Sequence, residues 1–460
     1  MSKYLKIVPL LVAALTALSV IRRELWFDEA LTLLNFVLPL DLGKIYFSYI
    51  IPNNQIVYSM LLKVWDQLYC GGIELTAYWR ILSLLCATAM LSIIMFLRNK
   101  IDEGKIFPAV LVLSAMSISA VFINYATALR GYAASWLFAA AALWGLYNIF
   151  HNRSRSGWFL YILSALLAVG TVPTNLLVLT AAAVYAVPWM EKAFWRDKRF
   201  YGVLAVIPAS LIVFYAPIAG SFLNTFKLGE GFSSRSGAMS VTLGMYAASF
   251  GLLLFFALLN WKKQPWQHCL RYLIWLMPFG AILILHRAPF PRVFVTMLPV
   301  LAMLVIDGIA GLINGNWRKF HRIAFFLTIA ASQCILIAGG AVVAHQCKLS
   351  NREDDFFHPW YMYPDYNISS TADELKKFPD DKVVFISFTA DPAPLIFYAA
   401  SNGLQRNFLS DIPYNSVQTL AKGSLLILAS DEDPAAFGKR FNGNLRLLSK
   451  KRWQSIWELY

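Results

Sequence analysis

The residues most suited to chemistry lie in one short charged stretch, residues 22–30, which reads RRELWFDEA and directly follows an apolar segment. Group transfer from a phosphate to a hydroxyl needs a base for the incoming oxygen and cations for the departing phosphate. Asp28 can act as that base, while Glu29 can assist it or cap the local helix. Adjacent helical residues point about 100° apart, so only one of the two is expected to face the reacting centre. The alternative is a solvated helix end, because charges commonly flank apolar segments.

Two arginines, Arg80 and Arg130, interrupt apolar runs further along the chain. A guanidinium group presents a fork of donors that matches phosphate oxygens, so both are candidate phosphate ligands. Charged residues at such positions usually have a partner. The alternative is therefore a structural ion pair with Glu24, Glu29 or Glu74.

A third basic group lies in the sequence HRAPFPR, which spans residues 286–292. His286, Arg287 and Arg292 place three cationic or potentially cationic side chains within seven positions and could hold the same phosphate. The alternative is a rigid turn made by Pro289 and Pro291, with Arg287 exposed. We favour Arg292 as the functional member of this group.

Uncharged polar residues add candidates for substrate contacts. Asn53 and Asn54 can hydrogen-bond substrate hydroxyls, or one of them can cap the helix that follows. Tyr132 can face the site, although tyrosines at a membrane interface often serve only as anchors.

The acidic triplet 431–433, Asp-Glu-Asp, is better explained as a turn than as a metal site. A proline follows it at position 434, and a carboxylate before a proline is typical of a helix N-terminus. We therefore expect a capped helix here, no metal-binding residues, and no cofactor.

The elements that position these residues follow from the composition. The chain has 460 residues, of which 58% are hydrophobic and 14% charged, against roughly 25% charged in soluble domains. This excludes an ordinary soluble enzyme. Since a bilayer core needs about 20 apolar residues per helix, the apolar runs predict about eleven transmembrane helices, with two in the longest run. The runs without charged residues are 7–21, 81–97, 106–129, 131–152, 156–190, 200–226, 236–261, 272–286, 293–306 and 323–347.

The net charge of +14 could suggest an acidic partner such as nucleic acid. Seventeen of the 40 Lys and Arg residues, however, fall in alternate connections between the apolar runs, as the positive-inside rule requires for a cytoplasmic N-terminus. The charge therefore reports topology, and we expect no nucleic-acid partner. Residues 56–70 are apolar but contain Lys63 and Asp66, so we expect them to lie at the interface. The first external loop then spans 22–80.

After residue 344 the composition changes, and 345–460 holds 13 basic and 14 acidic residues. Short apolar runs at 383–388 and 424–430 predict buried strands, and 392–400 and 434–441 predict helices. We expect a transmembrane domain at 1–344 and a small external α/β domain at 345–460. Its location suggests a role in selecting the acceptor.

Five motifs occur in an order that resembles a known family. They are WFDEA at 26–30, PNNQIVYSMLL at 52–62, YWRILS at 78–83, ALRGYA at 128–133 and RVFVTMLPVLAML at 292–304. This order resembles the membrane glycosyltransferases that use polyprenyl-phosphate sugars, a family of GT-C fold that includes the lipid A aminoarabinose transferases and the protein O-mannosyltransferases. The resemblance covers roughly the first 310 residues. Where many relatives carry His-Pro followed by Leu and Tyr, this chain has Gln55-Ile56-Val57-Tyr58. The aminoarabinose transferases carry an acidic residue in this neighbourhood that has no evident counterpart here, so a second carboxylate has no evident position.

The resemblance implies a multi-pass protein of the bacterial inner membrane with an active site that faces the periplasm. It would transfer a hexose or pentose from a polyprenyl-phosphate donor to lipopolysaccharide, another glycan or protein. Asp28 would be the catalytic aspartate, and Gln55 and Tyr58 would join the substrate-binding residues. Two alternatives stay open: a polysaccharide polymerase or ligase, and a transporter of lipid-linked sugars.

Overall fold

The computed structural model describes residues 2–49, 51, 54–190, 194–228, 234–259, 270–285, 289–313, 331, 334, 367–411 and 417–460. The chain forms two compact units. One comprises Met1–Arg22 with Leu40–Gly340, and the other comprises Arg23–Pro39 with Ala341–Tyr460. The segment that carries Asp28 thus belongs to the same unit as the C-terminal part. The boundary expected near residue 345 stays a prediction, because 335–366 lie outside the described residues.

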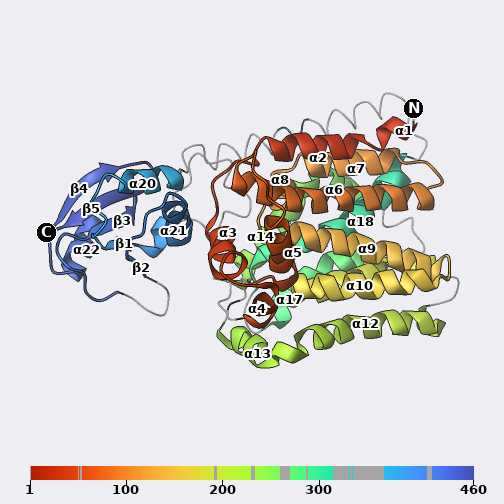
Figure 1. The fold of residues 1–460 in the computed structure, drawn as a ribbon. Coiled ribbons are helices and arrows are strands. Elements are labelled where there is room, and N and C mark those ends of the chain that lie inside the picture. Colours follow the sequence, from red (N-terminus) through yellow and green to blue (C-terminus); the bar gives the residue numbers. More distant parts are fainter. Residues whose placement is uncertain are drawn as a thin grey trace. The chain divides into compact units, whose positions relative to one another are not determined.

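The first unit is a bundle of helices (Figure 1). Its long helices α6 (Leu75–Ile101), α9 (Tyr132–Phe150) and α10 (Arg155–Thr171) pack one against the next, and α12 (Lys198–Tyr215) packs on α10. The other described helices and 3₁₀ segments of this unit are α1 (Ser2–Leu5), α2 (Val8–Leu18), α4 (Leu42–Phe47), α5 (Ile56–Asp66), α7 (Phe107–Ser117), α8 (Ala120–Ala126), α11 (Asn175–Tyr185), η2 (Val187–Trp189), η3 (Phe194–Arg196), η4 (Ala216–Ile218), α13 (Ala219–Leu228), α14 (Arg235–Phe250), α15 (Leu252–Leu259), η6 (Leu270–Leu276), α17 (Met277–Ile284), η7 (Pro291–Met297) and α18 (Leu298–Ile313).

A pair of glycines allows α9 and α10 to pack with their backbones in close approach. A Cβ added to Gly145 of α9 would lie 2.9 Å from the backbone nitrogen of Tyr161, and one added to Gly157 of α10 would lie 2.9 Å from the carbonyl oxygen of Gly145. Small residues at helix contacts are typical of bundles in membranes, where close van der Waals packing drives association.

Four described helical stretches are long and apolar enough to cross a membrane, and a bent pair makes five if it counts as one span. The four stretches are Leu75–Ile101, Tyr132–Phe150, Lys198–Thr225 and Pro291–Ile313. Shorter apolar helices are Val8–Leu18, Arg155–Thr171, Asn175–Trp189 and Leu270–Ile284. This arrangement agrees with a polytopic membrane protein, while the number of eleven spans stays a prediction. The expected span at 323–347 lies outside the described residues apart from positions 331 and 334.

The apolar run at 106–129, expected to supply one span, contains two helices. The segment forms α7 and α8, which meet at a bend of 75°. Ser119 lies at the bend as the N-cap of α8, and its Oγ accepts a hydrogen bond from the Phe122 N–H at 3.1 Å. Serine is favoured at caps because its side chain satisfies a free N–H group there.

The expected interfacial segment at 56–70 forms the short helix α5, which packs on α4, α6 and α10. Its buried side chains include Ile56, Val57, Tyr58 and Leu62. With eleven residues it is too short for the hydrocarbon core of a bilayer, which needs about 20. The helix places the polar residues before and within it against the bundle.

The second unit contains a five-stranded sheet of order β2-β1-β3-β5-β4 (Figure 1). The strands β2 (Phe408–Ser410), β1 (Val384–Ile386) and β3 (Leu425–Ala429) are parallel, whereas β5 (Gln454–Leu459) runs antiparallel to β3 and to β4 (Leu445–Lys450). The two predicted strands correspond to β1 and β3. Both are fully buried, as expected for strands covered on two faces.

Helices cover the two faces of this sheet. The side chains of α20 (Ile368–Leu375) and α21 (Pro392–Ser401) share one hydrophobic core with β1 and β3, and α22 (Pro434–Arg440) contributes to the other. The predicted helices at 392–400 and 434–441 are therefore confirmed. Asp433 is the N-cap of α22 and accepts a hydrogen bond from the Ala435 N–H at 3.0 Å, which confirms the expected turn and cap.

The segment 23–39 completes the second unit. It forms the helix α3 (Phe27–Thr32) and one π-helical turn, η1 (Leu33–Val37). Helix α3 packs on α21, and Trp26 packs against the hydrophobic core that lies beneath α20 and α21.

Candidate active site

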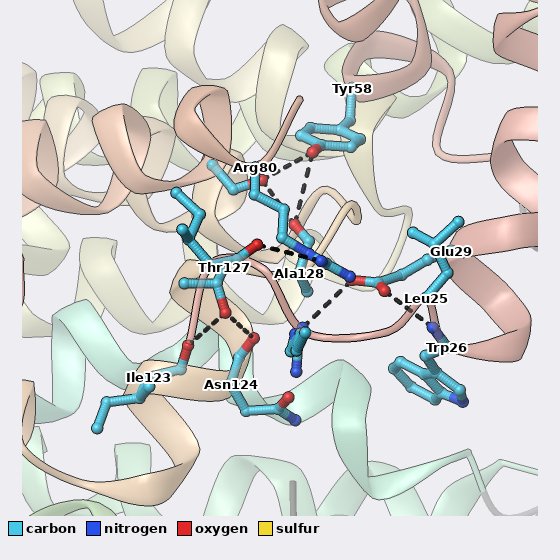
Figure 2. A network of polar contacts seen from close by, with 12 residues as sticks. Leu25, Trp26, Glu29, Tyr58, Arg80, Ile123, Asn124, Thr127 and Ala128 are labelled. Atoms are coloured by element: carbon cyan, nitrogen blue, oxygen red, sulfur yellow. Dashed lines mark hydrogen bonds and ion pairs between the residues drawn. The ribbon is translucent and has the colours of Figure 1, made fainter. Parts of the chain in front are cut away.

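The candidate carboxylates Asp28 and Glu29 lie in the first turn of α3. Glu29 is fully buried and holds the start of this helix. Its Oε2 accepts a hydrogen bond from the Trp26 N–H at 3.0 Å, and its Oε1 forms an ion pair with Arg23 at 3.2 Å. Figure 2 shows the contact between Glu29 and Trp26. Of the two roles expected for Glu29, the structure displays the capping one.

Asp28 is also buried, with 9% of its surface exposed. Its backbone carbonyl accepts a hydrogen bond from the Thr32 hydroxyl at 2.9 Å, one turn later in the helix. The alternative of a solvated helix end is wrong for this part of the stretch, because Asp28, Glu29 and the Arg23 side chain are all shielded from water. The two adjacent carboxylates thus lie in one buried turn. The oxygens of Glu29 are already bonded to the Trp26 N–H and to Arg23.

In the first unit, Arg80 lies fully buried in the second turn of α6. Its Nη1 donates a hydrogen bond to the carbonyl oxygen of Ile21 at 3.2 Å, just past the end of α2. A guanidinium at a helix C-terminus is stabilised by the carbonyl groups that end there. Glu74, one of its expected partners, instead accepts a hydrogen bond from the Thr76 hydroxyl.

Residues of three sequence motifs meet at the start of α9. The side-chain oxygen of Gln55 accepts a hydrogen bond from the Gly131 N–H. The Tyr58 and Ser83 hydroxyls lie 2.7 Å apart, and Ser83 donates to the Ala128 carbonyl at 2.6 Å. Figure 2 shows Tyr58 pointing toward Ala128. Gln55 and Tyr58 therefore fix the turn that precedes α9.

Gly131 is required for this arrangement by its lack of a side chain. A Cβ at this position would lie 2.3 Å from Cγ2 of Thr171, 3.0 Å from Oε1 of Gln55 and 3.1 Å from Cβ of Tyr58. Distances below 3.0 Å are essentially never found for real Cβ atoms. The close contact sets the position of the residues on either side.

Those flanking residues are Arg130 and Tyr132, which are 3% and 1% exposed. Arg130 lies near Tyr49: burial raises the pKa of the Tyr49 hydroxyl to about 12, and the Arg130 charge acts in the opposite direction. Tyr132 packs edge-to-face on Tyr125, with ring centroids 4.8 Å apart. A fully buried Tyr132 differs from an anchor tyrosine at the membrane surface.

Asn54 links the end of α4 to the start of α5. Its amide nitrogen donates to the carbonyls of Ile45 and Ser48 at 3.0 and 3.1 Å, and its oxygen accepts from the Ser59 hydroxyl at 3.1 Å. It makes no cap on α5, whose N-cap is Gln55. Asn53 lies outside the described residues.

Arg292 lies in the 3₁₀ segment η7, with its guanidinium over the Phe290 ring at 4.9 Å. Two aromatic donors hold η7 in place: the indole of Trp136 donates to the Val295 carbonyl at 2.8 Å, and the Tyr246 hydroxyl donates to the Phe294 carbonyl at 3.1 Å. Both donors come from helices of the same bundle, α9 and α14. The other members of the group, His286 and Arg287, lie outside the described residues.

One buried polar residue near this site was missed by the sequence reasoning. Asn175 begins α11, is fully buried, and donates to the Ser135 hydroxyl at 2.8 Å and the Ala168 carbonyl at 2.7 Å. Its side-chain oxygen has no partner among the described residues, and neither has the hydroxyl of Thr174. The polar pair after Pro173 was interpreted only as a connection between helices.

A second missed cluster lies at the opposite end of α6. Asp307 of α18 accepts hydrogen bonds from Arg98 at 2.5 Å, Arg271 at 2.6 Å and Tyr185 at 2.8 Å. Arg98 also pairs with Asp102 at 2.8 Å. These contacts connect four elements far apart in the sequence, so no local pattern signals them.

Within the described residues, no group of three or more His, Cys, Asp or Glu side chains is arranged to hold a metal ion.

No protein-family model and no curated protein sequence matches the chain. The fold is nevertheless similar to a solved one, described as "Crystal Structure of ArnT from Cupriavidus metallidurans bound to Undecaprenyl phosphate". The TM-score is 0.58 at 13% sequence identity, and the match covers 98% of this chain and 97% of that one. The chain therefore has a GT-C-like fold over nearly its whole length, which confirms and extends the resemblance of its first 310 residues.

Proposed function

We propose that this protein transfers a sugar from a polyprenyl-phosphate donor to an acceptor on the periplasmic side of the bacterial inner membrane. The observation that carries the proposal is the pair of buried guanidinium groups, Arg80 and Arg130, in an apolar bundle whose fold is that of a protein solved with undecaprenyl phosphate bound. A guanidinium group presents a fork of donors that matches the oxygens of a lipid phosphate.

In this proposal, Asp28 accepts the proton of the acceptor hydroxyl. The acceptor oxygen forms a bond to the anomeric carbon of the sugar, and the bond from that carbon to the phosphate oxygen breaks with its electron pair on the phosphate. Glu29 is less suited to the proton transfer, because Arg23 and the Trp26 N–H already engage its two oxygens. If the acceptor group is itself a phosphate, it needs no base and Asp28 positions it.

The leaving phosphate is bound by arginines in this proposal. Arg80 and Arg130 supply buried guanidinium groups, and Arg292 joins them, with Arg287 as a further candidate. Guanidinium groups that are shielded from water stabilise developing phosphate charge more strongly than exposed ones, because the local dielectric constant is low. Gln55, Tyr58 and Tyr132 shape the turn that carries Arg130, and Asn54 and Asn53 belong to the adjoining loop.

The test uses membranes that contain the protein and a panel of polyprenyl-phosphate sugars with a labelled sugar. We expect one donor to lose its label to an acceptor, and Asp28→Asn to lower this transfer by about two to four orders of magnitude, the usual contribution of a general base. Asp41→Asn is the matched control, since that carboxylate belongs to the same loop region and is 62% exposed.

Full transfer by Asp28→Asn, with wild-type transfer by the control, would remove Asp28 from the mechanism. Label that crosses the membrane while still attached to its lipid would indicate a transporter instead. Label that appears in chains of increasing length would indicate a polymerase.

A further inference from the structure

The C-terminal α/β domain holds the segment that carries Asp28. The Leu25 N–H donates a hydrogen bond to the Tyr398 hydroxyl at 2.9 Å, across 373 positions of sequence. On the other side, the hydroxyl of Ser369 donates to Glu24 at 2.6 Å, and the Ser369 N–H donates to the same carboxylate at 3.3 Å. Two consecutive residues before α3 are thus bonded to α20 and α21.

Aromatic packing adds to these hydrogen bonds. The Phe27 ring packs edge-to-face on Phe388, with centroids 5.6 Å apart. Trp26 packs against the hydrophobic core formed by α20, α21, β1 and β3. Every residue from Glu24 to Phe27 therefore contacts the α/β domain, and Asp28 follows directly in the chain.

The segment is bound at the position where α/β sheets usually bind ligands. The strand order β2-β1-β3 makes the carboxyl ends of β1 and β3 a topological switch point, and ligands bind in the crevice outside such an edge. Phe388, which packs on Phe27, lies two residues after the end of β1.

The polar groups at this edge are bonded to one another. Glu432 accepts hydrogen bonds from the Ser387 hydroxyl at 2.5 Å and from the Ala429 N–H at 2.7 Å. The Gln454 amide donates to the Ala390 carbonyl. The contact of this edge with segment 24–27 is therefore the Phe388 ring, and the hydrogen bonds to the segment come from Ser369 of α20 and Tyr398 of α21.

The effect on Asp28 follows from helix geometry. The first N–H groups of a helix have no partner inside the helix, and their hydrogen bonds set how the chain enters it. Here Glu29 engages the N–H of Trp26, and Tyr398 engages the N–H of Leu25. Leu25 and Trp26 directly precede α3, so these two hydrogen bonds fix the chain where it enters the helix that carries Asp28.

We propose that the C-terminal α/β domain positions the catalytic carboxylate, with Tyr398 as the positioning residue. This inference rests on the proposed function, because it assumes that Asp28 acts on the acceptor. It gives the domain a role in the rate of transfer, distinct from the choice of acceptor.

The test compares Tyr398→Phe with the wild type in the full-length protein. The substitution keeps the ring that packs on Phe397 and removes only the hydroxyl. Loss of a hydrogen bond to a shielded N–H is expected to misplace the carboxylate and to lower kcat on the order of tenfold, with the KM for the donor unchanged. Amide hydrogen exchange in the peptide 24–32 is expected to become faster. The control is Ser401→Ala on the same helix, whose hydroxyl donates a hydrogen bond within α21, to the Phe397 carbonyl at 2.9 Å.

Three results would overturn the positioning role. The first is an unchanged kcat in Tyr398→Phe. The second is a raised donor KM at wild-type kcat. The third is faster exchange throughout β1 and β3, which would indicate general loosening of the domain. Failure of the proposed function is recognised separately, because Asp28→Asn would then transfer sugar normally whatever Tyr398→Phe does to the exchange of peptide 24–32.

Discussion

The ion pair between Arg23 and Glu29 gives Glu29 a structural role at the start of α3. Their side chains are 4% and 0% exposed, and each is the other's counter-charge. Removing one member of a buried pair typically costs about 3–5 kcal/mol, because the remaining charge is left without compensation. Glu29 therefore stabilises the start of α3, and the adjacent Asp28 stays the candidate for proton transfer.

Gly131 provides a test of the site at the level of a single atom. Gly131→Ala places a Cβ 2.3 Å from Thr171 and displaces Gln55, so the turn that holds Arg130 must shift. Overpacking of this kind costs about 1–3 kcal/mol. We expect a lower melting temperature and, because Arg130 moves, a higher KM for the donor. Both are measured on detergent-solubilised protein.

The matched control is Gly280→Ala in α17, where no atom of the described residues lies within 4 Å of the added Cβ. It should leave stability and KM close to wild type. If Gly131→Ala behaves like this control, the turn before α9 does not position a donor ligand.

At the level of elements, the half-buried Asp307 and its buried partners Arg98, Arg271 and Tyr185 join α18, α6, η6 and α11. Arg98 and Arg271 both donate to its carboxylate, and Tyr185 packs under the Arg271 guanidinium at 4.0 Å. The elements that meet here carry Arg80 at the far end of α6 and adjoin Arg292 through α18. The network joins the elements at the end of α6 that lies away from Arg80.

Asp307→Asn is expected to lower the stability of the protein by about 3–5 kcal/mol, because two buried guanidinium groups lose their shared counter-charge. Thermal unfolding in detergent measures the effect. Asp41→Asn gives the comparison: its pair with Lys44 is exposed, and such pairs contribute about 0–1 kcal/mol. Equal melting temperatures for the two variants would contradict a structural role for the network.

At the level of the whole molecule, the side of the membrane on which each loop lies is a prediction from charge alone. Cys70 offers a direct check, since it is exposed and follows α5 in the loop expected outside. A variant with Cys269→Ser, Cys334→Ser and Cys347→Ser keeps two cysteines, Cys70 and Cys86. Of these, Cys86 is buried and Cys70 is exposed. A membrane-impermeant maleimide should then label Cys70 in intact spheroplasts. Labelling only after lysis would place Cys70 on the cytoplasmic side and contradict the predicted topology.

The sequence by itself determined the features that depend on neighbours along the chain. Apolar runs predicted the helical bundle, because the length and period of an apolar helix are visible in consecutive residues. The charges of Lys63 and Asp66 indicated that α5 does not cross the membrane. The proline after Asp433 indicated the start of α22. The two buried strands were equally evident from their composition. The family resemblance then named Asp28 and the arginines as candidates.

Only the tertiary structure decided which of these residues meet. The bonds from Leu25 to Tyr398, from Gln55 to Gly131 and from Arg98 to Asp307 join positions 76 to 373 residues apart. No local pattern encodes them, because each depends on how whole helices pack and on which buried polar groups then need a partner. The same reason explains why the sequence divided the chain at residue 345, whereas the packing of Trp26 and Phe27 groups the segment 23–39 with the C-terminal sheet.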